Sequence, residues 1–184
     1  MKNILLPLAA LGLLLPLHAE DYKIPKKDPV FTLSFPDKWT VTHADESVDG
    51  VTEDKSIELY AQTDDADSIE DSVKAAIDYL TKAGVKIKAD SQKEHNSEVN
   101  GMKLSGLNWD ATDEDGACRV SLSFIDIGDD QAITLLYWGS EEASKKHSKE
   151  LDSIIGSMKV VKAKAEKKDD KEEEKEDGDE KEEK

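Results

Sequence analysis

The 184-residue chain has one cysteine, Cys118, and this scarcity excludes an intramolecular disulfide. Apolar residues occupy alternate positions around Cys118, which is typical of a β-strand. We therefore expect its thiol to be a small buried apolar group rather than a reactive nucleophile or an intermolecular bridge. Stability must then come from an apolar core, and about 140 residues of patterned sequence are enough to form one.

Arginine is equally scarce, because Arg119 is the only one, and acidic residues outnumber Lys and Arg by 42 to 25. The net charge is −17, and removal of residues 1–19, which contain Lys2, would bring it to −18. Clustered cations drive the binding of phosphates, so this composition argues against a nucleic-acid partner and against an anionic membrane surface. Basic proteins and cations are compatible partners.

The apolar run from Ile4 to Leu17 is shorter than the ~20 residues that span a bilayer. Lys2 precedes it, and Ala19 and the acidic Glu20 follow it. This order is typical of a secretory signal peptide, and we expect cleavage near Ala19. The prediction is an exported protein, periplasmic or secreted, without stable membrane insertion after cleavage. No cysteine follows the run to accept a lipid anchor.

The strongest strand signal lies in residues 117–140, where two stretches rich in β-formers flank a turn at 128–130 and predict a central hairpin. Asn100-Gly101 predicts a type I′ turn, and a further turn is expected at 113–116. Residues 91–139 should therefore form a four-stranded antiparallel meander.

Shorter strands are predicted at 30–35, from Trp39 onward, at 57–61 and at 85–89, with an acidic loop at 44–55. Two helices are predicted from apolar residues at helical intervals. The first is capped by Asp67 and runs to Gly84, and its apolar stripe comprises Ile69, Val73, Ala76, Ile77 and Leu80. The second is capped by Ser140 and runs to Gly156.

From Ala163 onward the chain has 7 lysines and 12 acidic residues and almost no apolar side chains, which predicts a disordered tail. The predicted organisation is a signal peptide at 1–19, one domain at 20–162 and the tail at 163–184. The predicted fold class is α+β, with an antiparallel β-sheet of about seven strands flanked by two helices.

Residues 31–39, FTLSFPDKW, resemble the hydrophobic strand, proline, two polar residues and tryptophan that open the PsbP-like superfamily. Residues 154–158, IIGSM, are similar to the end of its last helix. This group includes PsbP and the exported bacterial proteins DcrB and LpqN. The resemblance spans roughly residues 28–160. It implies an antiparallel sheet between helices, in the order β-β-β-α-β-β-β-β-α, and a binding or accessory role, but it carries over no site residue.

The histidines of the predicted domain, His43, His95 and His147, lie far apart, and no pair has the spacing of a zinc site. We expect His147 to lie at the edge of the core with one nitrogen satisfied. No Gly-x-Ser-x-Gly motif is present. We accordingly predict no catalytic, cofactor-binding or metal-binding residue.

Two further groups have structural interpretations. The acidic turn lacks the ligand spacing and the distal Glu of an EF-hand, so a solvated hairpin turn is expected there. It comprises Asp110, Asp113, Glu114, Asp115 and Gly116. The tryptophans are expected to pack on the sheet rather than to form a sugar-stacking platform. They are Trp39, Trp109 and Trp138.

The leading hypothesis is an exported, non-enzymatic binding or accessory module that engages a protein or a component of the cell envelope, with basic proteins among the compatible partners. The first alternative is an enzyme or small-ligand-binding protein with a pocket beside the sheet, and a pocket that gathers His147 or His43 with carboxylates would favour the enzyme. The second alternative is a weak cation-binding protein that acts through acidic loops and the tail.

Overall fold

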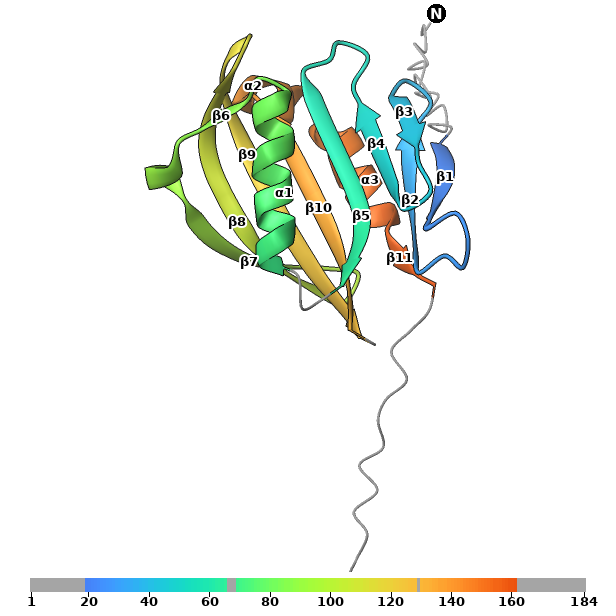
Figure 1. Ribbon diagram of the computed structural model, residues 1–184. Coiled ribbons are helices and arrows are strands. Elements are labelled where there is room, and N and C mark those ends of the chain that lie inside the picture. The colour runs from blue at the N-terminus through green and yellow to red at the C-terminus, as the bar shows by residue number, and fades with distance from the viewer. Residues whose placement is uncertain (1–18, 66–68, 129, 162–184) are drawn as a thin grey trace, which may run out of the picture.

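The computed structural model describes residues 19–65, 69–128 and 130–161. Residues 1–18 of the predicted signal peptide, the whole predicted tail and the predicted cap Asp67 lie outside the described residues. The described chain has an α+β fold built mainly from antiparallel strands, as predicted (Figure 1). Its strands are β1 (Ala19–Ile24), β2 (Phe31–Pro36), β3 (Thr40–His43), β4 (Ser47–Val51), β5 (Ile57–Asp65), β6 (Lys86–Ile87), β7 (Lys93–Val99), β8 (Met102–Asp113), β9 (Gly116–Gly128), β10 (Gln131–Gly139) and β11 (Lys159–Val160). Its helices are α1 (Ile69–Lys82), α2 (Glu141–Lys146), α3 (Ser148–Ser157) and the 3-10 helix η2 (Ala89–Ser91).

The larger sheet has eight strands in the order β3-β4-β5-β10-β9-β8-β6, and β7 pairs with another part of β8. Strands β7 to β10 are neighbours both in sequence and in the sheet, which confirms the predicted meander. The turn between β7 and β8 has positive φ at Asn100 (52°) and Gly101 (80°), as a type I′ turn requires. Because β5 pairs with β10, the two halves of the chain meet in the middle of this sheet.

A second sheet has three strands in the order β1-β2-β11. The sequence predicts a single sheet, and the structure corrects this because the strand predicted at 30–35, now β2, belongs to the small sheet. Strand β2 pairs along one edge with β1 and along the other with β11. Neither neighbour follows from the sequence pattern, since β1 is mostly polar and β11 has only two residues.

The large sheet separates two apolar clusters. Helix α1 lies on one face, and the small sheet with α2 and α3 lies on the other (Figure 1). Under α1, the cluster includes Trp109, Leu122 and Leu80. The predicted stripe of α1 is only partly buried, because Leu80 is buried whereas Ile69 and Ile77 are 42% and 38% exposed.

Strand β4 lies within residues 44–55, where the sequence predicts an acidic loop, so that prediction is wrong. Val48 is buried and points toward the core. Gly50 is required by its surroundings, because a Cβ there would lie 2.2 Å from Cε1 of Phe35. The strand signal is weak because its second inward position is a glycine that accommodates an aromatic ring of another strand.

The predicted C-terminal helix divides at His147 into α2 and α3, so one helix of the prediction becomes two. Ser140 is the N-cap, as predicted, and its Oγ accepts a hydrogen bond from the Ala143 amide at 3.0 Å. His147 has φ −99° and ψ 12° at the junction. All helices in the described ranges are too short or too polar to cross a lipid bilayer.

Candidate functional site

A groove of about 620 Å³ lies on the face of the large sheet that also carries α2 and α3. Strands β7, β8, β9 and β10 supply its floor, and Ser144, Leu151 and Ile155 of α2 and α3 supply its opposite wall. This volume lies within the ~300–1,000 Å³ of typical small-molecule sites. The groove is therefore large enough to hold a ligand, and we refer to it below as the groove.

The strand register sets the composition of the floor, because residues directly opposite each other on paired strands face the same side. The rows that run across the groove are Asp110-Arg119, Lys93-Asn108-Ser121-Tyr137, His95-Gly106-Ser123-Leu135 and Ser97-Leu104. Most of these side chains are small and polar or charged. The floor thus offers hydroxyl and amide groups instead of the apolar surface that a covering helix would need.

His95 occupies the middle of this floor. Its Nε2 lies 3.0 Å from the Ser123 hydroxyl oxygen, and its Nδ1 is buried without a hydrogen-bond partner among the described residues. Gly106 makes room for the imidazole ring, because a Cβ there would lie 2.7 Å from Cε1 of His95 and 2.1 Å from the carbonyl oxygen of Leu122. A Ser–His pair without a carboxylate on Nδ1 lacks the group that orients a catalytic histidine. The pair is better suited to hydrogen bonding than to nucleophilic catalysis.

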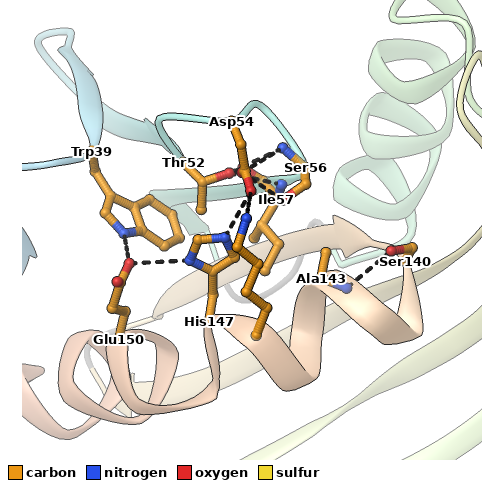
Figure 2. A network of polar contacts seen from close by, with 10 residues as sticks. Trp39, Thr52, Asp54, Ser56, Ile57, Ser140, Ala143, His147 and Glu150 are labelled. Atoms are coloured by element: carbon orange, nitrogen blue, oxygen red, sulfur yellow. Dashed lines mark hydrogen bonds and ion pairs between the residues drawn. The ribbon is translucent and has the colours of Figure 1, made fainter.

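The break between α2 and α3 builds a second polar site, the His147 network, defined by Trp39, Asp54, Lys146, His147 and Glu150 (Figure 2). Nε2 of His147 lies 3.1 Å from Asp54 Oδ2, and Nδ1 lies 3.3 Å from Glu150 Oε2. The indole nitrogen of Trp39 donates to the same Glu150 oxygen at 2.8 Å. A recess of about 490 Å³ adjoins these groups. Partners at both nitrogens correct the prediction that only one would be satisfied.

Asp54 is the ionised carboxylate at the centre of this network. Lys146 Nζ lies 2.5 Å from Asp54 Oδ2, and the Ser56 hydroxyl donates to Oδ1 at 2.6 Å. The hydrogen bond from Lys146, supported by the one from Ser56, holds the pKa of Asp54 well below its usual range. Because Ser56 donates to Asp54 and not to His147, the histidine cannot serve as its general base. The contacts join α2 and α3 to the turn at residues 52–56 and to Trp39 after β2, which is a structural role.

A third polar group lies beside α1, where the carboxyl groups of Asp49 on β4 and Glu58 on β5 lie diagonally across the strand pair, within hydrogen-bonding distance of each other. The hydroxyl of Tyr79 on α1 donates to Glu58 Oε1 at 2.6 Å. Burial, together with the charge of Asp49, raises the pKa of Glu58 from 4.5 to about 7. Burial also raises the pKa of Asp49. Protonation of Glu58 therefore relieves the repulsion between the two carboxyl groups.

The cysteine and the tryptophans have structural roles. Cys118 is buried under α1, as predicted, and desolvation raises the pKa of its thiol to about 12. Trp39 and Trp109 are buried, which confirms that they pack in the fold. Trp138 is half-buried and makes an edge contact with Tyr79 at 5.9 Å between ring centroids.

His43 and the tip of the acidic turn also lie outside the groove, whereas Asp110 of that turn lines it. His43 lies 2.9 Å from the carbonyl oxygen of Lys23 and contacts the ring of Tyr22. The acidic turn is the hairpin between β8 and β9, with Glu114 and Asp115 exposed, as predicted. Among residues 19–65, 69–128 and 130–161, no three His, Cys, Asp or Glu side chains are grouped so that they could hold a metal ion.

Sequence reasoning does not find the groove. The alternation of Arg119, Ser121 and Ser123 in β9 is the only sequence signal for its floor, and that pattern equally fits a solvent-exposed face. Burial of Ser123, which is 8% exposed, distinguishes the two cases and is visible only in the structure.

No family model matches the chain, and no curated protein matches it. Solved structures are similar to it. Cyanobacterial PsbP (CyanoP) from Synechocystis has a TM-score of 0.52 at 11% identity, over 84% of this chain and 99% of that one. A protein from Bacteroides thetaiotaomicron has a TM-score of 0.53 at 13% identity, over 78% of this chain and 48% of that one. LpqN, involved in cell envelope biogenesis of Mycobacterium tuberculosis, has a TM-score of 0.46 at 12% identity, over 78% of this chain and 91% of that one. The chain has the PsbP-like fold that its residues 31–39 and 154–158 resemble.

Proposed function

We propose that this protein is an exported, non-enzymatic binding module of the cell envelope, and that the groove is its binding site. The observation that carries the proposal is the groove itself, because its polar floor, which includes the buried Ser123, is separated from α2 and α3 by about 620 Å³ of space. Apolar strand faces are normally covered by other elements, whereas a concave surface with convergent polar groups is the usual form of a ligand site. Export rests on the signal-peptide pattern of residues 1–19.

The non-enzymatic part of the proposal rests on the two histidine sites. His95 has a hydroxyl neighbour but no described carboxylate on its other nitrogen, whereas His147 has two carboxylates but no hydroxyl to activate. Neither site therefore combines a nucleophile, a base and an orienting group. Binding, rather than bond cleavage, is the function that these contacts support.

The experiment compares the chain with one variant that fills the groove and one matched control. Ser121→Trp places an indole on the floor, and Ser153→Trp places the same side chain on the exposed surface of α3, outside the groove. Each tagged protein is incubated with envelope extract, and retained small molecules and proteins are identified by mass spectrometry. We expect a component that wild type and Ser153→Trp retain and Ser121→Trp loses. The proposal would be contradicted if Ser121→Trp retained the same components as wild type. It would also be contradicted if no component were retained specifically at several salt concentrations.

The alternative function, an enzyme, is favoured by one observation, which is the recess that gathers His147 with Asp54 and Glu150. In that case His147 would act on a proton of a bound substrate and not on a protein hydroxyl. The test is hydrolysis of a panel of esters and phosphoesters by wild type and His147→Gln. Turnover that His147→Gln abolishes while the circular dichroism spectrum is unchanged would establish the enzyme and overturn the non-enzymatic assignment.

A further inference from the structure

The groove differs in chemistry between its two ends. At one end, the rows Asp110-Arg119 and Lys93-Asn108 place two cations and one carboxylate on exposed side chains. At the other end, the lining becomes apolar, and Val99 and Leu104 face Leu151 and Ile155 of α3. About 20 Å separate the two ends, because they are three rows apart and alternate residues of a strand are ~7 Å apart.

The charge at the polar end is unusual for this chain. The net charge is −17, yet this end contains Lys93 and the only arginine, Arg119. Neither side chain lies within ion-pair distance of a described carboxylate. Arg119 lies directly across the strand pair from Asp110. The hydrogen bond from Lys145 and the charge of Arg119 lower the pKa of Glu141, so a bound anion would compete with these two carboxylates. Arg presents donors in a planar fork that matches a carboxylate. Charge complementarity therefore favours an anionic group here.

The apolar end is closed by a hydrogen-bonded link. The side-chain amide of Asn100, in the turn between β7 and β8, donates to the carbonyl oxygens of Gly156 (3.0 Å) and Met158 (2.9 Å) at the end of α3. Val99 precedes this turn, and Ile155 precedes Gly156, so the link lies directly beyond the apolar lining. A ligand that enters with its charged end at Arg119 would thus place an apolar end against a closed wall.

We propose that the groove binds a single-chain anionic amphiphile, with its carboxylate at Arg119 and Lys93 and its alkyl chain along Leu104, Val99 and Ile155. This inference rests on the proposed function and assigns the chemical class of its ligand. The hydroxyl of Ser121 lies in the same row as Lys93, within reach of the carboxylate. Ser123 and His95, which contact each other, lie one row further along the path of the chain. Leu151 contacts the chain from the helix side.

Calorimetry with myristate as the probe, below its micelle concentration, tests the proposal on the purified chain. We expect binding in the micromolar range, and octanoate should bind at least a hundredfold more weakly, because each buried methylene contributes about fourfold in affinity. Arg119→Gln should weaken myristate binding about tenfold or more. Lys82→Gln, which removes a cation from the last turn of α1 on the opposite face, is the matched control and should leave binding unchanged. Val99→Ser should weaken the binding of myristate more than the binding of octanoate.

The outcomes separate this inference from the proposed function. If myristate fails to bind, or binds Ser121→Trp and Arg119→Gln as well as it binds wild type, the amphiphile assignment is wrong. If envelope extract in the same series still yields a component that Ser121→Trp loses, the groove is a binding site for another chemistry and the proposed function stands. If neither myristate nor any extract component depends on the groove, both are wrong. Circular dichroism confirms that each variant is folded.

Discussion

The two faces of strand β9 differ in what lies over them. On one side, Val120 and Leu122 are almost completely buried under α1. On the other side, Ser121 and Ser123 form part of the floor of the groove. The same thirteen-residue strand thus supplies core on one face and a binding surface on the other. In this strand the small polar side chains mark the floor of a cavity, and the burial of Ser123 is what distinguishes that floor from the solvent side of a sheet.

The largest expected effect is a difference between the two faces of β9 in how much a substitution lowers the free energy of unfolding. Leu122→Ala removes a side chain that is 0% exposed and should lower the free energy of unfolding by about 2–5 kcal/mol, because a cavity remains in the core. Ser121→Ala, one residue away on the groove face, should change it by no more than about 0.5 kcal/mol. Urea denaturation of both variants measures the difference. Similar losses for the two would mean that the groove face is as tightly packed as the α1 face.

Glycine replacement tests how closely the groove floor is fitted. Gly106→Ala should destabilise the protein by about 2–3 kcal/mol, because the new Cβ would lie 2.1 Å from a backbone carbonyl that cannot easily move. Gly156→Ala is the control. No heavy atom lies within 4 Å of its added methyl group, and in a helix the change should stabilise by about 0.5–1 kcal/mol. Thermal unfolding followed by circular dichroism would show opposite shifts, and equal shifts would contradict the close contact at Gly106.

The link at the closed end of the groove can be divided into side-chain and backbone contributions. Asn100→Gly keeps the backbone freedom needed at φ +52° but loses two hydrogen bonds, so we expect a loss of about 1–2 kcal/mol. Asn100→Ala should cost about 1 kcal/mol more because of its positive φ. Chemical denaturation measures both changes. Equal stability of Asn100→Gly and wild type would show that the link contributes nothing.

The smallest effect concerns pH and the α1 side of the sheet. The pKa of Glu58 is about 7 in the fold and ordinarily 4.5, so between these values the folded chain binds a proton that the unfolded chain has released. Stability should therefore fall as pH rises from about 4.5 to 7, by about 1 kcal/mol once solvent screening of this half-buried pair is allowed for. Glu58→Gln should remove that slope, whereas Glu114→Gln in the exposed turn should preserve it. Urea midpoints at pH 5 and pH 8 provide the measurement, and a slope that is unchanged in Glu58→Gln would refute the assignment.

Local patterns were enough to predict the meander and several turns. The alternation in β9, the Asn100-Gly101 turn and the Ser140 cap each depend on residues close together in the chain, and the structure confirms all three. The resemblance of residues 31–39 and 154–158 to the PsbP-like superfamily implied an antiparallel sheet with flanking helices, and the fold is similar to that of cyanobacterial PsbP.

Features that depend on distant partners could not be predicted. Gly50 of β4 lies against the ring of Phe35, and His147, where α2 ends, contacts Asp54, 93 residues earlier in the chain. The groove likewise depends on which half of the sheet α3 covers. Residue types alone do not encode that choice, because serine fits both a wetted surface and the floor of a cavity.

The small sheet places the two ends of the described chain on opposite edges of one strand. Strand β2 pairs with β1 from Ala19 onward and with β11 at Lys159–Val160. A ribosome therefore delivers the last strand of this sheet only after about 160 residues, and closing so long a loop is slow compared with forming the meander. The nascent chain cannot complete the small sheet before β11 has been synthesised. For a chain threaded through a membrane, this sheet could close only after β11 has crossed.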